Sequence, residues 1–113
     1  MIRRALFHPK ARQAIQDLPK PMRTAVGISI FDLQRGALLS MPTSRPMPDV
    51  APGVHELRIR GADGTCRVFY YVKSIHGILI LHVFEKKTQK TPLREIELAR
   101  KRLLDFLDRG EFI

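Results

Sequence analysis

Arginines on two neighbouring predicted strands are the residues of this chain best suited to chemistry on a phosphate group. Arg58 and Arg60 alternate with Leu57 and Ile59, so both arginines face one side of their strand. Arg67 lies on the next predicted strand, and paired strands run about 4.8 Å apart, so side chains from both can reach one phosphate. Arginine stays protonated and binds phosphate through two parallel hydrogen bonds. The alternative is that these arginines are solvated and keep the sheet soluble.

A run of lysines after the last predicted strand adds to this basic set. Lys86, Lys87 and Lys90 cannot be buried without partners, so we expect them to line a rim or groove and to bind phosphate. A lysine whose pKa is lowered by cationic neighbours could also transfer a proton, and Lys87 is the candidate for that role. Lys73 shares a predicted strand face with Arg67 and is a further candidate for phosphate binding. The alternative is a solvated charge run.

These residue types suit cleavage of RNA by attack of the ribose 2′-hydroxyl on the adjacent phosphate. The reaction needs a proton acceptor, a proton donor and cations where negative charge builds up, and it requires no metal ion. Of the four histidines, His82 is predicted within an apolar strand, where it is either catalytic or a satisfied core residue. His55 begins the arginine strand and is a second candidate. With one cysteine and no metal-binding spacing among the histidines, we expect no metal site and no cofactor.

The chain is strongly basic for its length. Its 113 residues carry 20 lysines and arginines against 11 aspartates and glutamates, a formal net charge of +9. This length suits a single domain, and the charge favours a polyanionic partner such as nucleic acid. No apolar run approaches the roughly 20 residues that span a bilayer, and the N-terminus lacks the apolar segment of a secretory signal. We therefore expect a cytoplasmic protein with no membrane partner.

Periodicity predicts elements in the order β-α-α-β-β-β-α. Strands are expected at residues 3–7, 56–60, 66–73 and 78–84, and helices at 9–18, from 21 to Gly36 or Ser40, and from 92 to Gly110. Thr91 is the expected N-cap of the last helix. The prolines between residues 40 and 53 exclude both a helix and a central strand there. The class is therefore α+β, with a mainly antiparallel curved sheet covered by an N-terminal helical hairpin and a C-terminal helix.

The predicted strand at 66–73 combines aromatic and basic residues on one face. Phe69 and Tyr71 share this face with Arg67, and they either pack beneath a helix or stack an unpaired RNA base. Cys66 faces the other way and is expected to be a small core residue.

Two segments and the element order resemble the RelE/ParE toxin superfamily. They are GVHELRIRGADGTCRVFYYV, at residues 53–72, and ILILHVFEKKTQKTPLREIELARKRL, at residues 78–103. Within the superfamily, the chain is most similar to the HigB-like group of phage-derived proteins. The resemblance covers nearly the whole chain, and the combined motifs carry it, because each one alone is weak.

The resemblance implies the toxin of a type II toxin-antitoxin system. Such a toxin is typically a ribosome-dependent endoribonuclease that cuts messenger RNA and is silenced by a cognate antitoxin, here expected to be HigA-like with a helix-turn-helix. Arg58 and Arg67 match basic positions of the family, and Arg67 matches the arginine held to bind the cleaved phosphate. The lysines from Lys86 to Lys90 fall in the family's basic segment, and His82 fits the HigB-like pattern.

The chain also departs from the RelE pattern. Glu56 stands where RelE carries a lysine proposed as base, Gln89 lies near the place of a RelE arginine, and the RelE tyrosine after the last strand has no evident counterpart. Phosphate binding can be carried over, but the general base and acid cannot. Three alternatives stay open: a ParE-like gyrase inhibitor, a noncatalytic RNA-binding module, and a decayed prophage remnant that retains only the fold.

Overall fold

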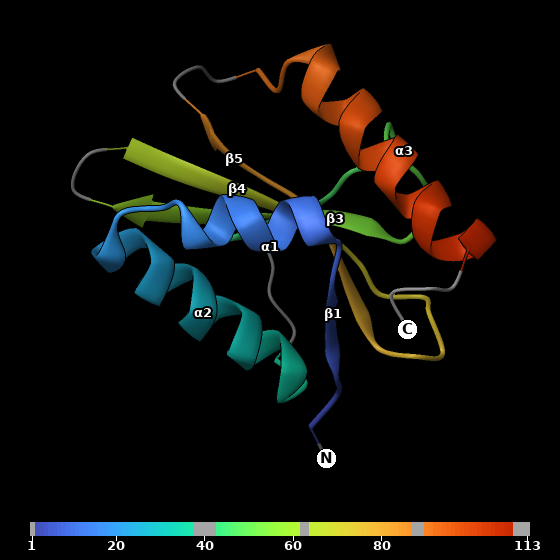
Figure 1. Cartoon of the computed structure of the whole chain (residues 1–113), viewed down its shortest axis with the longest axis horizontal. Helices are drawn as coiled ribbons and strands as arrows, with labels where there is room; N and C mark the ends of the chain where they lie inside the picture. The colour runs from blue at the N-terminus through green and yellow to red at the C-terminus, as the bar shows by residue number, and fades with distance from the viewer. Residues whose placement is uncertain (1, 38–42, 62–63, 87–89, 110–113) are drawn as a thin grey trace.

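A five-stranded sheet lies between two helical layers in the computed structural model, which describes residues 2–37, 43–61, 64–86 and 90–109 (Figure 1). The elements in chain order are β1 (Ala5–Phe7), α1 (Pro9–Gln16), α2 (Lys20–Gln34), β2 (Ser44–Pro46), β3 (Val54–Gly61), β4 (Gly64–Tyr71), β5 (Ile78–Lys86) and α3 (Leu93–Arg109). The strand order is β1-β5-β4-β3-β2, and only the β1–β5 pair is parallel. The predicted α+β class, helical hairpin and C-terminal helix are confirmed.

The sheet contains one strand more than the sequence predicts. Strand β2 lies in the proline-rich connector and pairs Arg45 with Glu56 of β3. Its last residue, Pro46, lacks the N–H that a central strand would need, and an edge strand tolerates this. The sequence predicted that the connector forms neither a helix nor a central strand, and the edge strand β2 is compatible with that prediction.

Each face of the sheet packs against its own helical layer. One face meets α1 and α2 in a cluster that includes Val26, Ile30, Leu57, Ile59, Cys66 and Val68. The other face meets α3 in a cluster that includes Phe69, Leu79, Leu81, Ile96, Leu103 and Phe106. Cys66 is fully buried as expected, and burial raises its pKa to about 11. Phe69 is also fully buried, so it packs beneath a helix and is not available to stack a base.

An irregularity in β5 changes which residues face α3. Phe69 pairs with His82 and Tyr70 pairs with Ile80, so Leu81 is an extra residue in this strand. Leu81 belongs to the cluster under α3, and its neighbour His82 also contacts α3 through Glu95. A regular strand would send two adjacent side chains to opposite faces. The bulge therefore fixes His82 beneath α3.

Two predicted details at element ends are wrong. Strand β4 ends at Tyr71, so Lys73 lies beyond it and not on its face. Helix α3 begins at Leu93, and the Thr91 hydroxyl contacts Glu56 of the sheet and does not cap the helix. Glycine 36, with a φ of 89°, follows the end of α2, as one of the two predicted stops. The predicted stop of the last helix at Gly110 lies outside the described residues. None of the described helices is long and apolar enough to cross a membrane.

Candidate nucleic-acid interface

Four cationic side chains gather around one carboxylate on the sheet face that α3 partly covers. We call Arg45, Arg58, Arg67 and Lys86 the cation cluster, and Glu56 is its central carboxylate. Arg58 and Arg67 are direct partners across β3 and β4, as their predicted strand alternation requires. The neighbouring edge strand β2 supplies Arg45, and the end of β5 supplies Lys86. Four strands of the sheet therefore contribute to one basic site.

The carboxylate of Glu56 is fully buried and is shared by three arginines. Its Oε1 lies 3.2 Å from Nε of Arg45, 3.4 Å from Nε of Arg58 and 3.8 Å from Nε of Arg67. The Thr91 hydroxyl donates to its Oε2 at 3.0 Å. A buried charge is stable only when it is paired and hydrogen-bonded, and these contacts satisfy that need for Glu56. Among the residues that the structure describes, one negative charge serves all three arginines, so these contacts do not neutralise them.

The arginines turn their Nε edges toward Glu56. Among the described residues, the terminal nitrogens of Arg58 and Arg67 make no hydrogen bond, and the buried Nε of Arg67 has none either. The side chain of Arg58 is 23% exposed and that of Arg67 is 10% exposed, so an anion can approach from the solvent side. Two adjacent guanidinium groups with donors to spare match the oxygens of a phosphate.

Lys86 is the member of the cluster suited to move a proton. It is buried, and its Nζ donates to the Thr91 hydroxyl at 3.1 Å. Burial lowers the pKa of Lys86, and the nearby charges of Arg67, Arg45 and Arg58 lower it further, against the opposing effect of Glu56. A lysine of this kind can release its proton more readily than a solvated one.

The structure brings some of the other predicted phosphate-binding residues to this end of the sheet. Arg60 pairs with Thr65 and lies on the same face two residues beyond Arg58, where it is exposed. Lys90 is exposed and follows β5 by a few residues. Lys87 lies outside the described residues, so its predicted roles in proton transfer and phosphate binding stay predictions.

Lys73 does not join the cation cluster. It lies six residues from Arg67 along the chain, toward the opposite end of β4, which is about 20 Å in an extended strand. Its side chain is exposed, and the aliphatic part lies against Gly53. The alternation that seemed to align Lys73 with Arg67 ends at Tyr71, because the chain leaves the sheet there.

His82 is held in a second buried group of charged residues beneath α3. We call His82, Glu95 and Arg102 the histidine group. An N–H of Arg102 donates to Nδ1 of His82 at 2.7 Å, so the other ring nitrogen, Nε2, carries the proton and donates to Glu95 at 3.2 Å. Burial lowers the pKa of His82, which keeps the ring neutral at pH 7. Both ring nitrogens are engaged, as in a satisfied core histidine.

Phe84 stands between the histidine group and the cation cluster. It is the strand partner of Arg67 and stacks on His82 with ring centroids 5.1 Å apart. His55 belongs to β3, but it stacks on Tyr70, which packs on the α1 and α2 side of the sheet. The structure therefore brings neither His82 nor His55 into the cation cluster.

Sequence reasoning missed three contributors to the site. Arg45 was hidden in the proline-rich connector, although an arginine before Pro46 is biased toward the extended backbone of a strand. Glu56 was noted only as a departure from the RelE pattern. Thr91 was taken for a helix cap. Glu56 could have predicted this arrangement, because a carboxylate on the same strand face as arginines is buried only when it is paired with cations.

The fold is similar to that of a solved toxin structure. A solved structure titled as Escherichia coli toxin RelE, a double arginine-to-alanine mutant in the free state, matches with a TM-score of 0.66 and 18% sequence identity. The match covers 92% of this chain and 100% of the RelE chain, so the two share one fold. The model of the family described as Phage derived protein Gp49-like (DUF891) matches residues 13–104. The chain belongs to this family, and the predicted RelE/ParE resemblance is confirmed. No curated protein matches the chain.

Proposed function

We propose that this protein is the toxin of a type II toxin-antitoxin system and that it cleaves messenger RNA on the ribosome. The observation that supports this most is the cation cluster, in which Arg45, Arg58 and Arg67 share the single carboxylate of Glu56. The Gp49-like family and the fold shared with a protein named a toxin point the same way. We also propose that the protein belongs to the HigB-like group of these toxins.

In the proposed reaction, the scissile phosphate lies against the terminal nitrogens of Arg58 and Arg67. The ribose 2′-hydroxyl loses its proton, its oxygen bonds to phosphorus, and the bond from phosphorus to the 5′ oxygen breaks. The products are a 2′,3′-cyclic phosphate and a 5′-hydroxyl. Negative charge grows on the phosphate oxygens in the transition state, where the guanidinium groups already stand.

Lys86 is the proposed proton donor to the leaving 5′ oxygen. Its lowered pKa favours proton release at this end of β5, and its hydrogen bond to Thr91 holds the Nζ in place. Glu56 is a positioning residue, because it orients Arg58 and Arg67 by their Nε edges and leaves their terminal nitrogens for substrate. We assign no residue as the base, since His82 and His55 lie away from the cluster.

The proposed partners follow from the same resemblance. The ribosome presents the messenger RNA, a cognate antitoxin silences the toxin in the cytoplasm, and that antitoxin is expected to be HigA-like with a helix-turn-helix. The formal net charge of +9 suits both polyanionic partners, ribosome and RNA.

Inducible expression without antitoxin, followed by mapping of messenger RNA 5′ ends in ribosome-bound and free pools, tests the proposal. New 5′ ends should appear in the ribosome-bound pool and disappear in Arg67→Ala. Lys101→Ala, an exposed cation on α3, is the matched control and should cut normally. Growth arrest with gyrase trapped on DNA and intact RNA would instead identify a ParE-like inhibitor. Binding of RNA without cuts would indicate a noncatalytic module, and harmless expression would indicate a remnant.

A further inference from the structure

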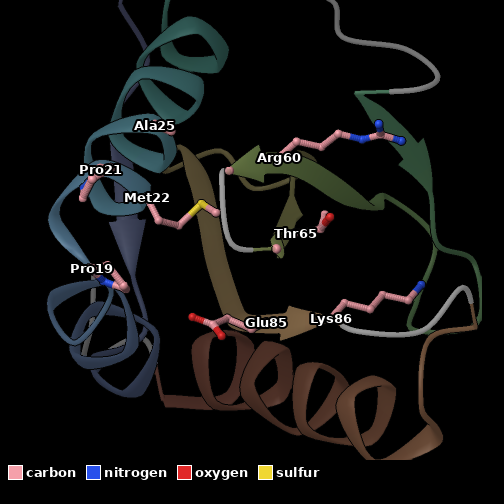
Figure 2. A pocket seen from close by; sticks show the side chains of 10 residues that line it. Pro19, Pro21, Met22, Ala25, Arg60, Thr65, Glu85 and Lys86 are labelled. Atoms are coloured by element: carbon pink, nitrogen blue, oxygen red, sulfur yellow. The ribbon is translucent and has the colours of Figure 1, made fainter.

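A pocket of about 310 Å³ lies between the start of α2 and the ends of β3, β4 and β5 (Figure 2). Its helical wall is apolar and consists of Pro19, Pro21, Met22 and Ala25. Its opposite wall includes the backbone of the glycines that end β3 and begin β4. The proline rings, the Met22 thioether and the glycine backbone bring no hydrogen-bonding side chain to these two walls. Such walls suit the apolar faces of a ring system.

The pocket has one acidic side chain, Glu85. In Figure 2 the carboxylate of Glu85 points toward the helices, whereas the side chain of its neighbour Lys86 points away on the other side of the strands. The side chain of Glu85 is exposed and makes no hydrogen bond or ion pair with any residue that the structure describes. An ionised carboxylate accepts hydrogen bonds and donates none. The pocket therefore favours a flat ligand that presents N–H donors.

The pocket adjoins the cation cluster at the end of the sheet. Arg60 and Lys86 line the border of the pocket, and Lys86 is also a member of the cluster. Arg60 is two residues beyond Arg58, which is about 7 Å along a strand. A strand of RNA whose phosphate lies at Arg58 and Arg67 would bring a neighbouring nucleotide to this border. Recognition of single-stranded RNA commonly uses such splayed-out bases.

We infer that this pocket binds an unpaired nucleobase that flanks the cleaved phosphate, and that Glu85 selects a base with an exocyclic amino group over uracil. The inference rests on the proposed function and names its specificity-determining residue. Cytosine, adenine and guanine offer an exocyclic amino donor to a carboxylate, whereas the single N3–H donor of uracil lies between two carbonyl acceptors. The two carbonyl oxygens that flank this N–H repel the Glu85 carboxylate, so uracil is disfavoured relative to the bases with an amino group.

The first test compares the base composition around mapped cleavage sites. In the wild-type chain, uracil should be depleted about tenfold at one position beside the cut, in line with one good base contact. Glu85→Gln, whose amide can donate to a carbonyl, should abolish this depletion. Ala25→Leu, which fills the pocket, should do the same. The matched controls Glu97→Gln on α3 and Thr24→Leu on the exposed side of α2 should keep the wild-type pattern. Depletion that persists in both pocket variants overturns the inference.

The second test reads the pocket without any cleavage. Methyl-labelled methionines report on it, because the Met22 methyl lies against Gly61 in the pocket, whereas Met47 is buried in the other core cluster. Cytidine 5′-monophosphate should shift the Met22 signal at about tenfold lower concentration than uridine 5′-monophosphate, and neither should move Met47. Equal responses to the two nucleotides, or an unchanged preference in Glu85→Gln, overturn the inference.

The two tests separate failure of this inference from failure of the proposed function. If the wild-type chain cuts no RNA, the proposed nuclease is wrong, and the Met22 signal still decides whether the pocket selects a base. If the chain cuts RNA without bias against uracil, the nuclease stands and the pocket assignment falls. Failure of both leaves the apolar wall around Met22 for a partner protein's side chain.

Discussion

The sheet face toward α3 carries two groups of buried charged side chains with different charge balance. In the histidine group, Arg102 and Glu95 carry opposite charges on either side of the neutral ring of His82. In the cation cluster, four cations surround the single carboxylate of Glu56. In a group of buried charged residues that serves only the fold, positive and negative charges are expected to balance, because an unpaired buried charge lowers stability. A surplus of positive charge is retained where an external anion will balance it.

The largest expected effect is the loss of cleavage on removing Arg67. Arg67→Ala should reduce the rate of ribosome-dependent cleavage at least about a hundredfold, because it removes charge stabilisation of the transition state. The fold should survive, since Arg45, Arg58 and Thr91 still hold Glu56. A cleavage assay with circular dichroism on the same samples checks both. An unchanged rate in a folded variant would remove Arg67 from the site.

The next effect distinguishes the two central carboxylates by stability. Glu56→Gln should lower the free energy of unfolding by about 3 kcal/mol, because it leaves several buried or half-buried cations without their anion. Glu95→Gln in the histidine group should cost about 1 kcal/mol, because the amide oxygen can still accept from His82. Urea denaturation measures both. Added phosphate should restore stability to Glu56→Gln more than to Glu95→Gln, and equal losses would contradict the contrast between the groups.

A smaller effect appears in the salt dependence of RNA binding. Arg58→Ala should lower the slope of log affinity against log salt by about 0.7, the share of one phosphate contact on a single strand. Arg102→Ala should leave the slope unchanged, since Arg102 donates to His82 and to the carbonyl of Leu81 beneath α3. Filter binding of a short unstructured RNA over a salt series provides the measurement. A reduced slope in both variants would mean that RNA reaches the histidine group.

The smallest effect concerns pH. Burial lowers the pKa of His82 in the folded chain below its ordinary value near 6.5, so the unfolded chain takes up a proton first as pH falls. The stability linked to His82 is therefore present above pH 6.5 and is lost at lower pH. His55, whose pKa burial also lowers, acts in the same direction. Urea denaturation between pH 7.5 and 5.5 should show this loss, weaker in His82→Gln and unchanged in His76→Gln. If His82→Gln lost as much stability at low pH as the wild-type chain, the pH dependence would come from groups other than His82.

Local pattern predicted much of the fold and about half of the site. Strand alternation placed Arg58 and Arg67 on one face, because side-chain direction in a strand depends only on position. It could not show that Arg45 joins them, because that depends on which segment adds to the sheet edge. Thr91 matched the local pattern of a helix cap, but its hydroxyl donates a hydrogen bond to Glu56 of the sheet instead.

The remaining misses also come from tertiary structure. The predicted face of Lys73 failed because the strand ended two residues earlier, at Tyr71. The bulge at Leu81 arises from packing against β4 and α3, and no signal in the strand's own residues announces it. The bulge places His82 under α3, on the face that also carries the arginines, and Phe84 lies between the two groups. The charge balance of the cation cluster and of the histidine group depends on all of their contacts, so it could not be predicted from the sequence.

The parallel pairing of β1 with β5 determines how late in synthesis the sheet can be completed. Of the five strands, β1 is synthesised first and β5 last, and Ala5 must wait for Ile78 before the two can pair. Bringing such distant segments together is entropically slow, and it cannot start before β5 leaves the ribosome. Lys86 is the last residue of β5, and Thr91 emerges later still. A polypeptide interrupted during translation therefore lacks part of the cation cluster, and under the proposed function it would not harm the cell that makes it.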